Sequence, residues 1–126
     1  MLLFPFFIIN AQSSSGVELT ANPSQLYCPL TEQPIVTDFY IKGTLEGGIS
    51  AIYIQVSSGF NQSEDVLKLN ENFENIIPLW NASEAKLTLS STDGSVLSIA
   101  ELIQAVKSVV FYSSQSNPVR DKSISI

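Results

Sequence analysis

Residues 51–58 read Ala-Ile-Tyr-Ile-Gln-Val-Ser-Ser, and this stretch decides the class of fold. Ile52, Ile54 and Val56 are apolar, and each is followed by a more polar residue. Successive side chains of a β-strand point to opposite faces, so a period of two places these three residues on one buried face. The stretch therefore predicts a half-buried strand.

Similar short apolar or alternating runs recur along the chain, at residues 35–41, 66–69, 76–80, 85–89, 109–112 and 122–126. Turn signals separate them at intervals of roughly ten residues, which is typical of sandwiches and barrels. Pro78 cannot donate to a ladder, so the run around it is expected at a sheet edge or at a bulge. The pattern predicts an all-β fold, either a sandwich or a barrel.

Residues 98–107 break this pattern and predict a short α-helix. Apolar residues recur at helical spacing from Ile99 to Val106, which gives the segment one apolar face. Ser98 followed by Glu101 is the signature of a capping box, and Lys107 in the last turn complements the helix dipole. The helix is too short to stand alone, so we expect it to close one open end of the core.

The start of the chain is apolar from Leu2 to Ile9 and then turns polar. A run this short cannot cross a bilayer, which takes about 20 residues, but it matches the core of a secretory signal peptide. Residues 1–11 are therefore predicted to be a signal peptide, 12–16 a Ser-rich spacer and 17–126 the β-sandwich module. No Lys or Arg precedes the apolar run, so a start codon farther upstream is one explanation. An N-terminal strand is the alternative interpretation.

The composition excludes several functions. Twelve acidic and six scattered basic residues give a net charge of −6, which argues against nucleic acid and anionic membranes as partners. Histidine is absent, so neither a Ser-His-Asp triad nor a Cys-His pair can form. Cys28 is the single cysteine, which excludes an internal disulfide; we expect it to pack as a small apolar residue. No catalytic residue is predicted, and the chain is expected not to be an enzyme.

Few residues remain as candidates for binding. Trp80, Tyr53 and Tyr112 would form a platform for sugars or proteins if they were exposed together, although Trp80 is expected at the core or its rim. Carboxylates that would suit calcium are Asp38, Glu46, Asp65, Asp93 and Asp121, but they form no calcium-loop motif. No cofactor or metal site is therefore predicted, with calcium as the alternative. Glu64–Asp65 and Glu71/Glu74 are close carboxylate pairs that we interpret as solvated turn residues.

Three stretches resemble a cadherin-like β-sandwich repeat of large bacterial surface proteins. They are Ala51-Ile-Tyr-Ile-Gln-Val-Ser-Ser-Gly59 with Glu64-Asp-Val-Leu-Lys-Leu69, Leu79-Trp-Asn-Ala-Ser-Glu-Ala-Lys-Leu-Thr-Leu89, and the predicted helix running through Val109-Val-Phe-Tyr112 to the last strand. The opening Tyr27-Cys-Pro-Leu-Thr-Glu-Gln-Pro-Ile-Val36 is similar to the N-terminal module of Bacteroidota proteins exported by the type IX secretion system. The chain departs from the family at Glu84-Ala85 and at Ser90-Ser91, where the family usually has glycine.

The resemblance implies an Ig-like or cadherin-like antiparallel β-sandwich. It also implies a location and partners. Such a module would be secreted to the cell surface, outside the outer membrane, and would be followed by downstream domains of the same polypeptide, often a C-type lectin-like domain and a sorting domain. The chain would then be a fragment that stops after its last strand. We expect a non-catalytic structural or adhesion module with no transmembrane span, which spaces or presents a neighbouring domain. The alternative is a domain that itself binds extracellular glycans or proteins.

Overall fold

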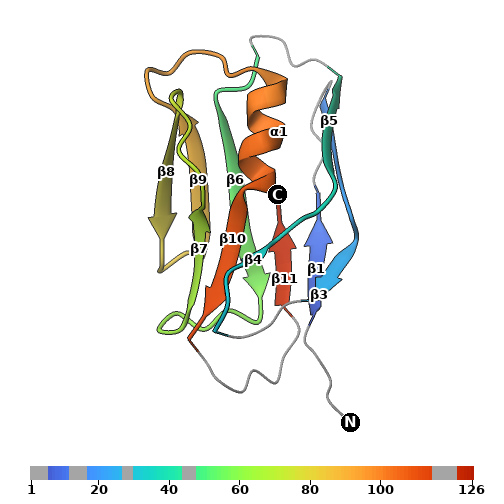
Figure 1. Ribbon diagram of the computed structural model, residues 1–126, viewed down its shortest axis with the longest axis vertical. Helices are drawn as coiled ribbons and strands as arrows, with labels where there is room; N and C mark the ends of the chain where they lie inside the picture. The colour runs from blue at the N-terminus through green and yellow to red at the C-terminus, as the bar shows by residue number, and fades with distance from the viewer. Residues whose placement is uncertain (1–5, 12–16, 27–29, 44–47, 115–121) are drawn as a thin grey trace.

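A computed structural model describes residues 6–11, 17–26, 30–43, 48–114 and 122–126 of the chain (Figure 1). Their regular structure is β-strand apart from one short helix. In chain order the elements are β1 (Phe6–Asn10), β2 (Val17–Ala21), β3 (Ser24–Leu26), β4 (Gln33–Pro34), β5 (Phe39–Gly43), β6 (Ala51–Ser58), β7 (Asp65–Leu69), β8 (Ile76–Asn81), β9 (Lys86–Ser91), α1 (Ile99–Lys107), β10 (Val109–Ser113) and β11 (Lys122–Ser125). The predicted all-β class with one helix is confirmed.

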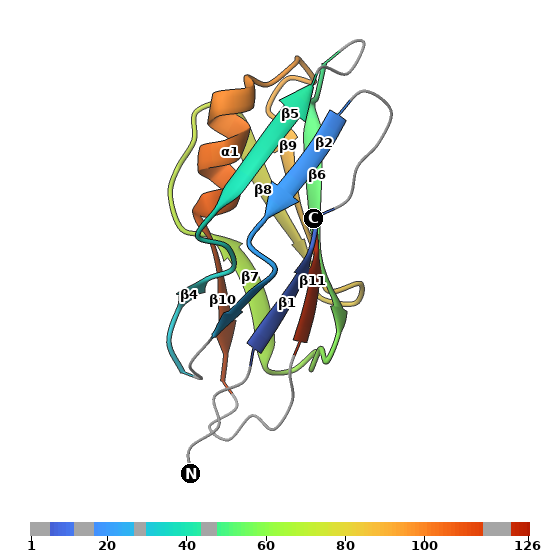
Figure 2. The ribbon, with the colours of Figure 1, turned by 90° about the vertical axis from the view of Figure 1, so that its right-hand side faces the viewer.

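The strands form three sheets. The large sheet has the order β3-β1-β11-β6-β9-β8, the small sheet has the order β4-β10-β7, and β2 pairs with β5. Every pairing is antiparallel except that of β1 with β11, which is parallel. The small sheet and α1 lie in front of the large sheet in Figure 1, and the side view of Figure 2 shows the β2–β5 pair next to α1.

One hydrophobic core fills the space between these layers. The inward residues of β6 are buried and Tyr53 between them is exposed, as the alternation in this stretch predicts. Each fully buried aliphatic or aromatic side chain contributes roughly 1.5–3 kcal/mol of transfer free energy. The largest fully buried side chains come from all three sheets and the helix: Phe39, Phe111, Ile35, Ile54, Leu67, Leu87, Leu89, Leu102 and Ile124.

The helix lies where the sequence predicts it. The Ser98 side chain accepts a hydrogen bond from the backbone N–H of Glu101 at 3.1 Å, which caps the first turn. Leu102, Ala105 and Val106 are fully buried, and α1 packs against β5. Ile99, expected on the apolar face, remains exposed at the first turn. It was expected to close an open end of the core; instead it lies in the front layer in line with β10 and covers the upper part of the large sheet with apolar side chains (Figure 1).

The strand predicted at 35–41 begins only at Phe39, because residues 35–38 form the link between two strands. β4 ends at Pro34 and β5 begins at Phe39, in a different sheet. Between them the carboxamide oxygen of Asn22 accepts hydrogen bonds from the backbone N–H groups of Thr37 at 3.0 Å and Asp38 at 3.1 Å. These bonds replace a strand ladder and let the chain cross from one sheet to the other, which the apolar alternation could not indicate.

The apolar start of the chain lies in the large sheet. β1 runs between β3 and β11, Ile9 is 7% exposed, and its backbone N–H donates to the carbonyl of Pro23 at 3.0 Å. This placement corresponds to the alternative interpretation, an N-terminal strand, while cleavage of a signal peptide stays a prediction. The predicted spacer at 12–16 and Cys28 lie outside the described residues.

Strand β8 forms one edge of the large sheet, as Pro78 predicts. Its hairpin to β9 turns through Asn81, whose side-chain oxygen accepts the backbone N–H of Ser83 at 3.1 Å. Ala85 completes the turn with φ of +55°, a left-handed conformation that disfavours a Cβ atom. This residue belongs to the Glu84-Ala85 pair at which the chain lacks the glycine of the resembling family.

Candidate functional site

A buried ion pair lies at the end of the core opposite the helix. Lys122 Nζ donates to Asp65 Oδ2 at 2.8 Å and to the backbone carbonyl of Gly59 at 2.6 Å. The side chains of the lysine and the aspartate are 3% and 0% exposed. This buried ion pair connects β7, which carries Asp65, with β11, which carries Lys122.

The strand register positions both charges. Lys122 is the first residue of β11 and shares its inward face with Ile124 and Ile126. Asp65 is the first residue of β7 and shares its inward face with Leu67. Because β11 belongs to the large sheet and β7 to the small sheet, the pair connects the two layers.

The loop between β6 and β7 holds the aspartate in place. The backbone N–H of Asn61 donates to Asp65 Oδ2 at 2.9 Å, and the backbone N–H of Asp65 donates back to the carbonyl of Asn61 at 2.8 Å. Oδ2 therefore accepts two hydrogen bonds. The other carboxylate oxygen, Oδ1, is buried and has no hydrogen-bond partner among the residues that the structure describes.

The surroundings of the pair are mostly apolar. The Lys122 ammonium lies 5.7 Å from the centroid of the Phe111 ring, which is itself buried. Removing two charges from water is costly, and the cost is offset only when their mutual geometry and hydrogen bonds are good. Here the ammonium has two acceptors while the carboxylate has one unsatisfied oxygen, so the pair is asymmetric in its hydrogen bonding.

The interpretation of Asp65 as a solvated turn residue was wrong. Its burial arises because β7 begins one residue earlier than the apolar run does, which turns the aspartate into the core. Its partner, Lys122, was not predicted as a site residue, and its ammonium group lies next to the Asp65 carboxylate. One signal was available: its period-two spacing from Ile124 and Ile126 placed a lysine on a core face, where it needs an acidic partner.

The other carboxylates do not gather. No group of three or more His, Cys, Asp or Glu side chains suited to a metal ion occurs in the described part of the chain. Asp38 is exposed at the crossing between β4 and β5, and Asp93 is exposed in the turn after β9. Glu46 and Asp121 lie outside the described residues. Calcium binding therefore stays an alternative, and the described residues form no cluster that would hold the ion.

Asp93 is held by its own turn. Hydrogen bonds from Ser95, through its side chain and its backbone N–H, and from the Ser91 hydroxyl lower the pKa of Asp93 from 3.8 to about 2. The Ser95 N–H and the Ser91 Oγ both reach Oδ1 at 2.9 Å. The side chain fixes the Asp93–Gly94 turn, in which Gly94 has φ of +80°.

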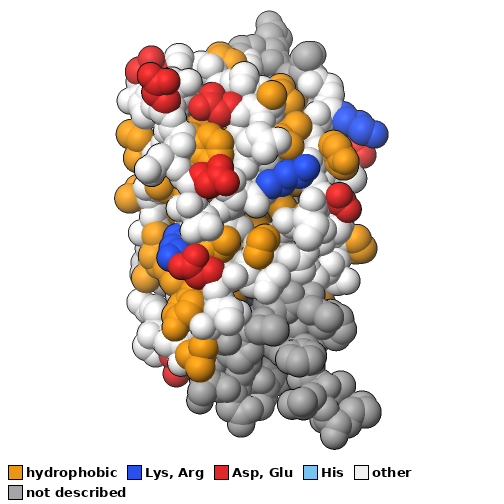
Figure 3. Space-filling model, in the orientation of Figure 1, with side chains coloured by type: hydrophobic (Ala, Val, Ile, Leu, Met, Phe, Trp, Pro, Cys, Tyr) orange, Lys and Arg blue, Asp and Glu red, His pale blue; other side chains and the backbone are white. Residues whose placement is uncertain are grey.

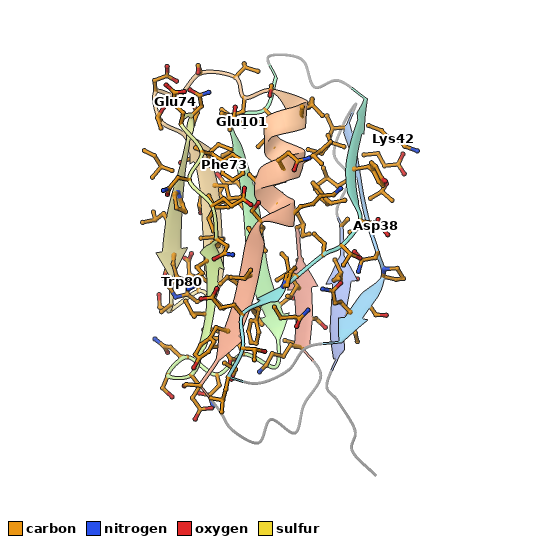
Figure 4. All side chains as sticks on the ribbon, in the orientation of Figure 1. Asp38, Lys42, Phe73, Glu74, Trp80 and Glu101 are labelled. Carbon is orange, nitrogen blue, oxygen red and sulfur yellow. The ribbon has the colours of Figure 1, made fainter. Side chains whose placement is uncertain are left out.

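The three predicted binding residues do not share a surface. Trp80 pairs with the buried Leu87 on the core side of β8, and its ring packs edge-on against Phe60 with centroids 6.0 Å apart. It lies at the rim of the core, near the lower end of β8 in Figure 4. Tyr53 points from the opposite face of the same sheet, and Tyr112 is half-buried in the small sheet.

A small apolar row does lie on the outer face of the large sheet. Tyr53 is 54% exposed and Leu79 is 66% exposed, and both flank Thr88 across the ladder. Lys86 Nζ lies 5.3 Å from the centroid of the Tyr53 ring. Ile77 continues the exposed row along β8. The opposite face of the molecule, seen in Figure 3, mixes acidic and basic side chains with apolar and uncharged ones.

Comparison with family models, curated proteins and solved structures finds no match to this chain. The cadherin-like resemblance thus rests on the quoted residues. Within the described ranges, no helix has the length and hydrophobicity that crossing a membrane requires.

Proposed function

We propose that this chain is a non-catalytic, extracellular structural and adhesion module with an Ig-like or cadherin-like antiparallel β-sandwich fold. It would space or present a neighbouring domain of a larger protein at the cell surface. The observation that supports this function is the attachment of the last strand. β11 pairs with β6, a ladder that cleavage after Ala11 would leave intact, and its first residue, Lys122, binds Asp65 of β7 in the small sheet.

This attachment suits a strand that transmits tension. A downstream domain would pull on the chain through Ile126, along the axis of β11. The tension would fall on the ladder between β11 and β6 and on the buried ion pair between the layers. Resistance to force depends on the rate of unfolding, so contacts that must break early in extension determine it.

The rival proposal is a domain that binds glycans or proteins in its own right. The exposed row of Tyr53, Leu79 and Ile77 favours it, because an aromatic ring flanked by aliphatic side chains can pack on a sugar face or a protein. The row contains only one aromatic residue, and Trp80 lies on the other face of the sheet. The structural module is therefore the better supported function.

A single-molecule pulling experiment tests the structural function. The full chain is held through its two ends, and its unfolding force is compared with that of Lys122→Met. We expect the variant to unfold at clearly lower force, while Lys68→Met, which removes an exposed lysine paired with Glu32, leaves the force unchanged. Equal forces for the wild type and Lys122→Met would remove the support for this proposal.

A glycan array with the isolated chain tests the rival. If the chain is a structural module, we expect neither the wild type nor Tyr53→Ser to bind any glycan specifically. Saturable binding that disappears in Tyr53→Ser would establish the rival instead. Ser57, exposed on the same strand, offers the control Ser57→Ala, which should leave any such binding intact.

Location at the cell surface is part of the proposal. N-terminal sequencing of the exported protein tests it together with the predicted cleavage after Ala11. A mature chain that begins at Gln12 supports the signal peptide. A mature chain that retains Phe6–Asn10 makes β1 a permanent strand of the domain and moves the export signal elsewhere.

A further inference from the structure

The buried lysine and aspartate are an amine and a carboxyl group held in contact away from water. Their separation is 2.8 Å between Lys122 Nζ and Asp65 Oδ2, and both side chains are almost fully buried. The hydrogen bond to Oδ2 holds Nζ beside the carboxyl group that it would attack, and groups that reach an attack geometry within one molecule behave as though their concentration were about 10⁵–10⁸ M. We propose that Lys122 and Asp65 form an intramolecular amide (isopeptide) bond after the chain has folded.

The atoms around the pair fit the product better than the reactants. The amide would keep Oδ2 as its carbonyl oxygen, which accepts the N–H of Asn61 at 2.9 Å. It would keep one N–H on Nζ, which donates to the Gly59 carbonyl at 2.6 Å. The atom that leaves is Oδ1, the carboxylate oxygen that has no partner among the described residues. Every polar atom of the amide thus has a partner in place.

The reaction balances without any further reagent. A proton passes from the Nζ ammonium to Oδ2, its hydrogen-bond partner, which gives a neutral amine and a carboxylic acid. The Nζ lone pair attacks Cγ, and the π electrons move to Oδ1. A second proton passes from Nζ to Oδ1 within the tetrahedral intermediate, which then carries two hydroxyl groups. The Oδ2 hydroxyl gives its proton to Oδ1, the carbonyl forms again at Oδ2, where the Asn61 N–H supports it, and Oδ1 departs as water. One ammonium and one carboxylate give one amide and one water molecule.

The apolar surroundings favour this direction. Two buried charges disappear, and with them the desolvation penalty of an imperfectly satisfied pair. The Phe111 ring lies 5.7 Å from Nζ and helps to exclude the water that would reverse the reaction. The bond joins β7 to β11 and thereby the two layers of the fold. It is a property of the folded chain and does not depend on the function proposed above.

Mass spectrometry of the denatured full chain tests this proposal. After incubation in the folded state, we expect a mass lower than the sequence mass by one water molecule. Proteolysis should give a branched peptide that joins the segments around Asp65 and Lys122, with no tryptic cleavage at Lys122. A folded wild-type chain that keeps its full mass after prolonged incubation would overturn the proposal.

Two variants sharpen the result. Asp65→Asn reaches the same amide by losing ammonia instead of water, so its mass should coincide with that of the reacted wild type. Lys122→Arg keeps a cation at this position but cannot form the amide, so it should keep its full mass. The Asp93–Gly94 step can also lose water by cyclising, so a water loss that peptide mapping places there, and not at Lys122, would also overturn the proposal.

Discussion

The two ends of the core are filled in opposite ways. At one end α1 covers the core with Leu102, Ala105 and Val106, all fully buried and apolar. At the other end a single ion pair, Lys122 with Asp65, is buried between the same layers. We call them the helix end and the polar end. Figure 1 shows them at the top and the bottom of the molecule.

The difference between the ends lies in what each interaction requires. Apolar side chains need only volume and shape, so the helix end tolerates small shifts at a graded cost. A buried charge needs its partner, and its free energy changes sharply when the partner is removed. The interaction at the polar end is therefore the more specific of the two, and it is the more sensitive to the loss of a single side chain.

Removal of one charge from the polar end should give the largest effect. Relative to wild type in which the amide has not formed, Lys122→Met leaves the Asp65 carboxylate buried without a cation, which we expect to lower the free energy of unfolding by about 3–5 kcal/mol. Urea denaturation measures it. The matched control Lys68→Met breaks an exposed pair with Glu32 and should cost less than about 1 kcal/mol. Similar losses in both variants would contradict the distinction between buried and exposed pairs.

Truncation of a buried side chain at the helix end should lower the free energy of unfolding somewhat less. The loss should depend only on the volume of the side chain that is removed. Leu102→Ala removes a fully buried side chain and should lower the free energy of unfolding by about 2–5 kcal/mol. Leu102→Met conserves volume and should cost less than about 1.5 kcal/mol. The same urea titrations compare the two. If Leu102→Met proved as damaging as Leu102→Ala, the helix end would not be the tolerant one.

The cap of the helix should contribute less than its buried face. Ser98→Ala removes the hydrogen bond from the Glu101 N–H and should cost about 1 kcal/mol. Ser98→Gly should lower the stability by only a few tenths of a kcal/mol, because glycine is tolerated at an N-cap. Thermal denaturation of the two variants separates these values. A larger loss for glycine than for alanine would rule out capping as the role of Ser98.

The smallest effect concerns the exposed Asp93 turn near the helix end. Its pKa is lower in the folded chain, about 2 against 3.8, so ionised Asp93 stabilises the fold above about pH 4. This contribution falls as the pH drops toward 2. The difference in melting temperature between wild type and Asp93→Asn should therefore shrink on acidification. A difference that stays constant with pH would show that the carboxylate charge is not the cause.

The sequence predicted the helix end far better than the polar end. The period of α1 and its Ser98 cap are local signals, so its bounds and its buried face followed from ten residues. The ion pair joins residues 57 positions apart, and Asp65 was interpreted as a solvated turn residue because β7 was expected to begin later. The crossing near Thr37 was missed for a similar reason, since a side chain distant in sequence, Asn22, accepts its N–H groups.

The candidate site was harder to predict than the fold. Trp80 was expected near the core and lies at its rim, but composition and periodicity gave no way to tell that Tyr53 and Tyr112 belong to different sheets. Strand order decides which aromatic side chains meet, and strand order depends on long-range pairing. The lysine at a core position of the last strand was the one local signal of the polar end.

Native-state hydrogen exchange of Lys122→Met tests most directly whether the polar end fastens the last strand. Local openings of different free energy can be resolved amide by amide. We predict that the backbone amides of β11 and β7 lose much more protection from exchange than those of α1, β8 and β9. A uniform loss of protection across all of these elements, or none in β11, would contradict it.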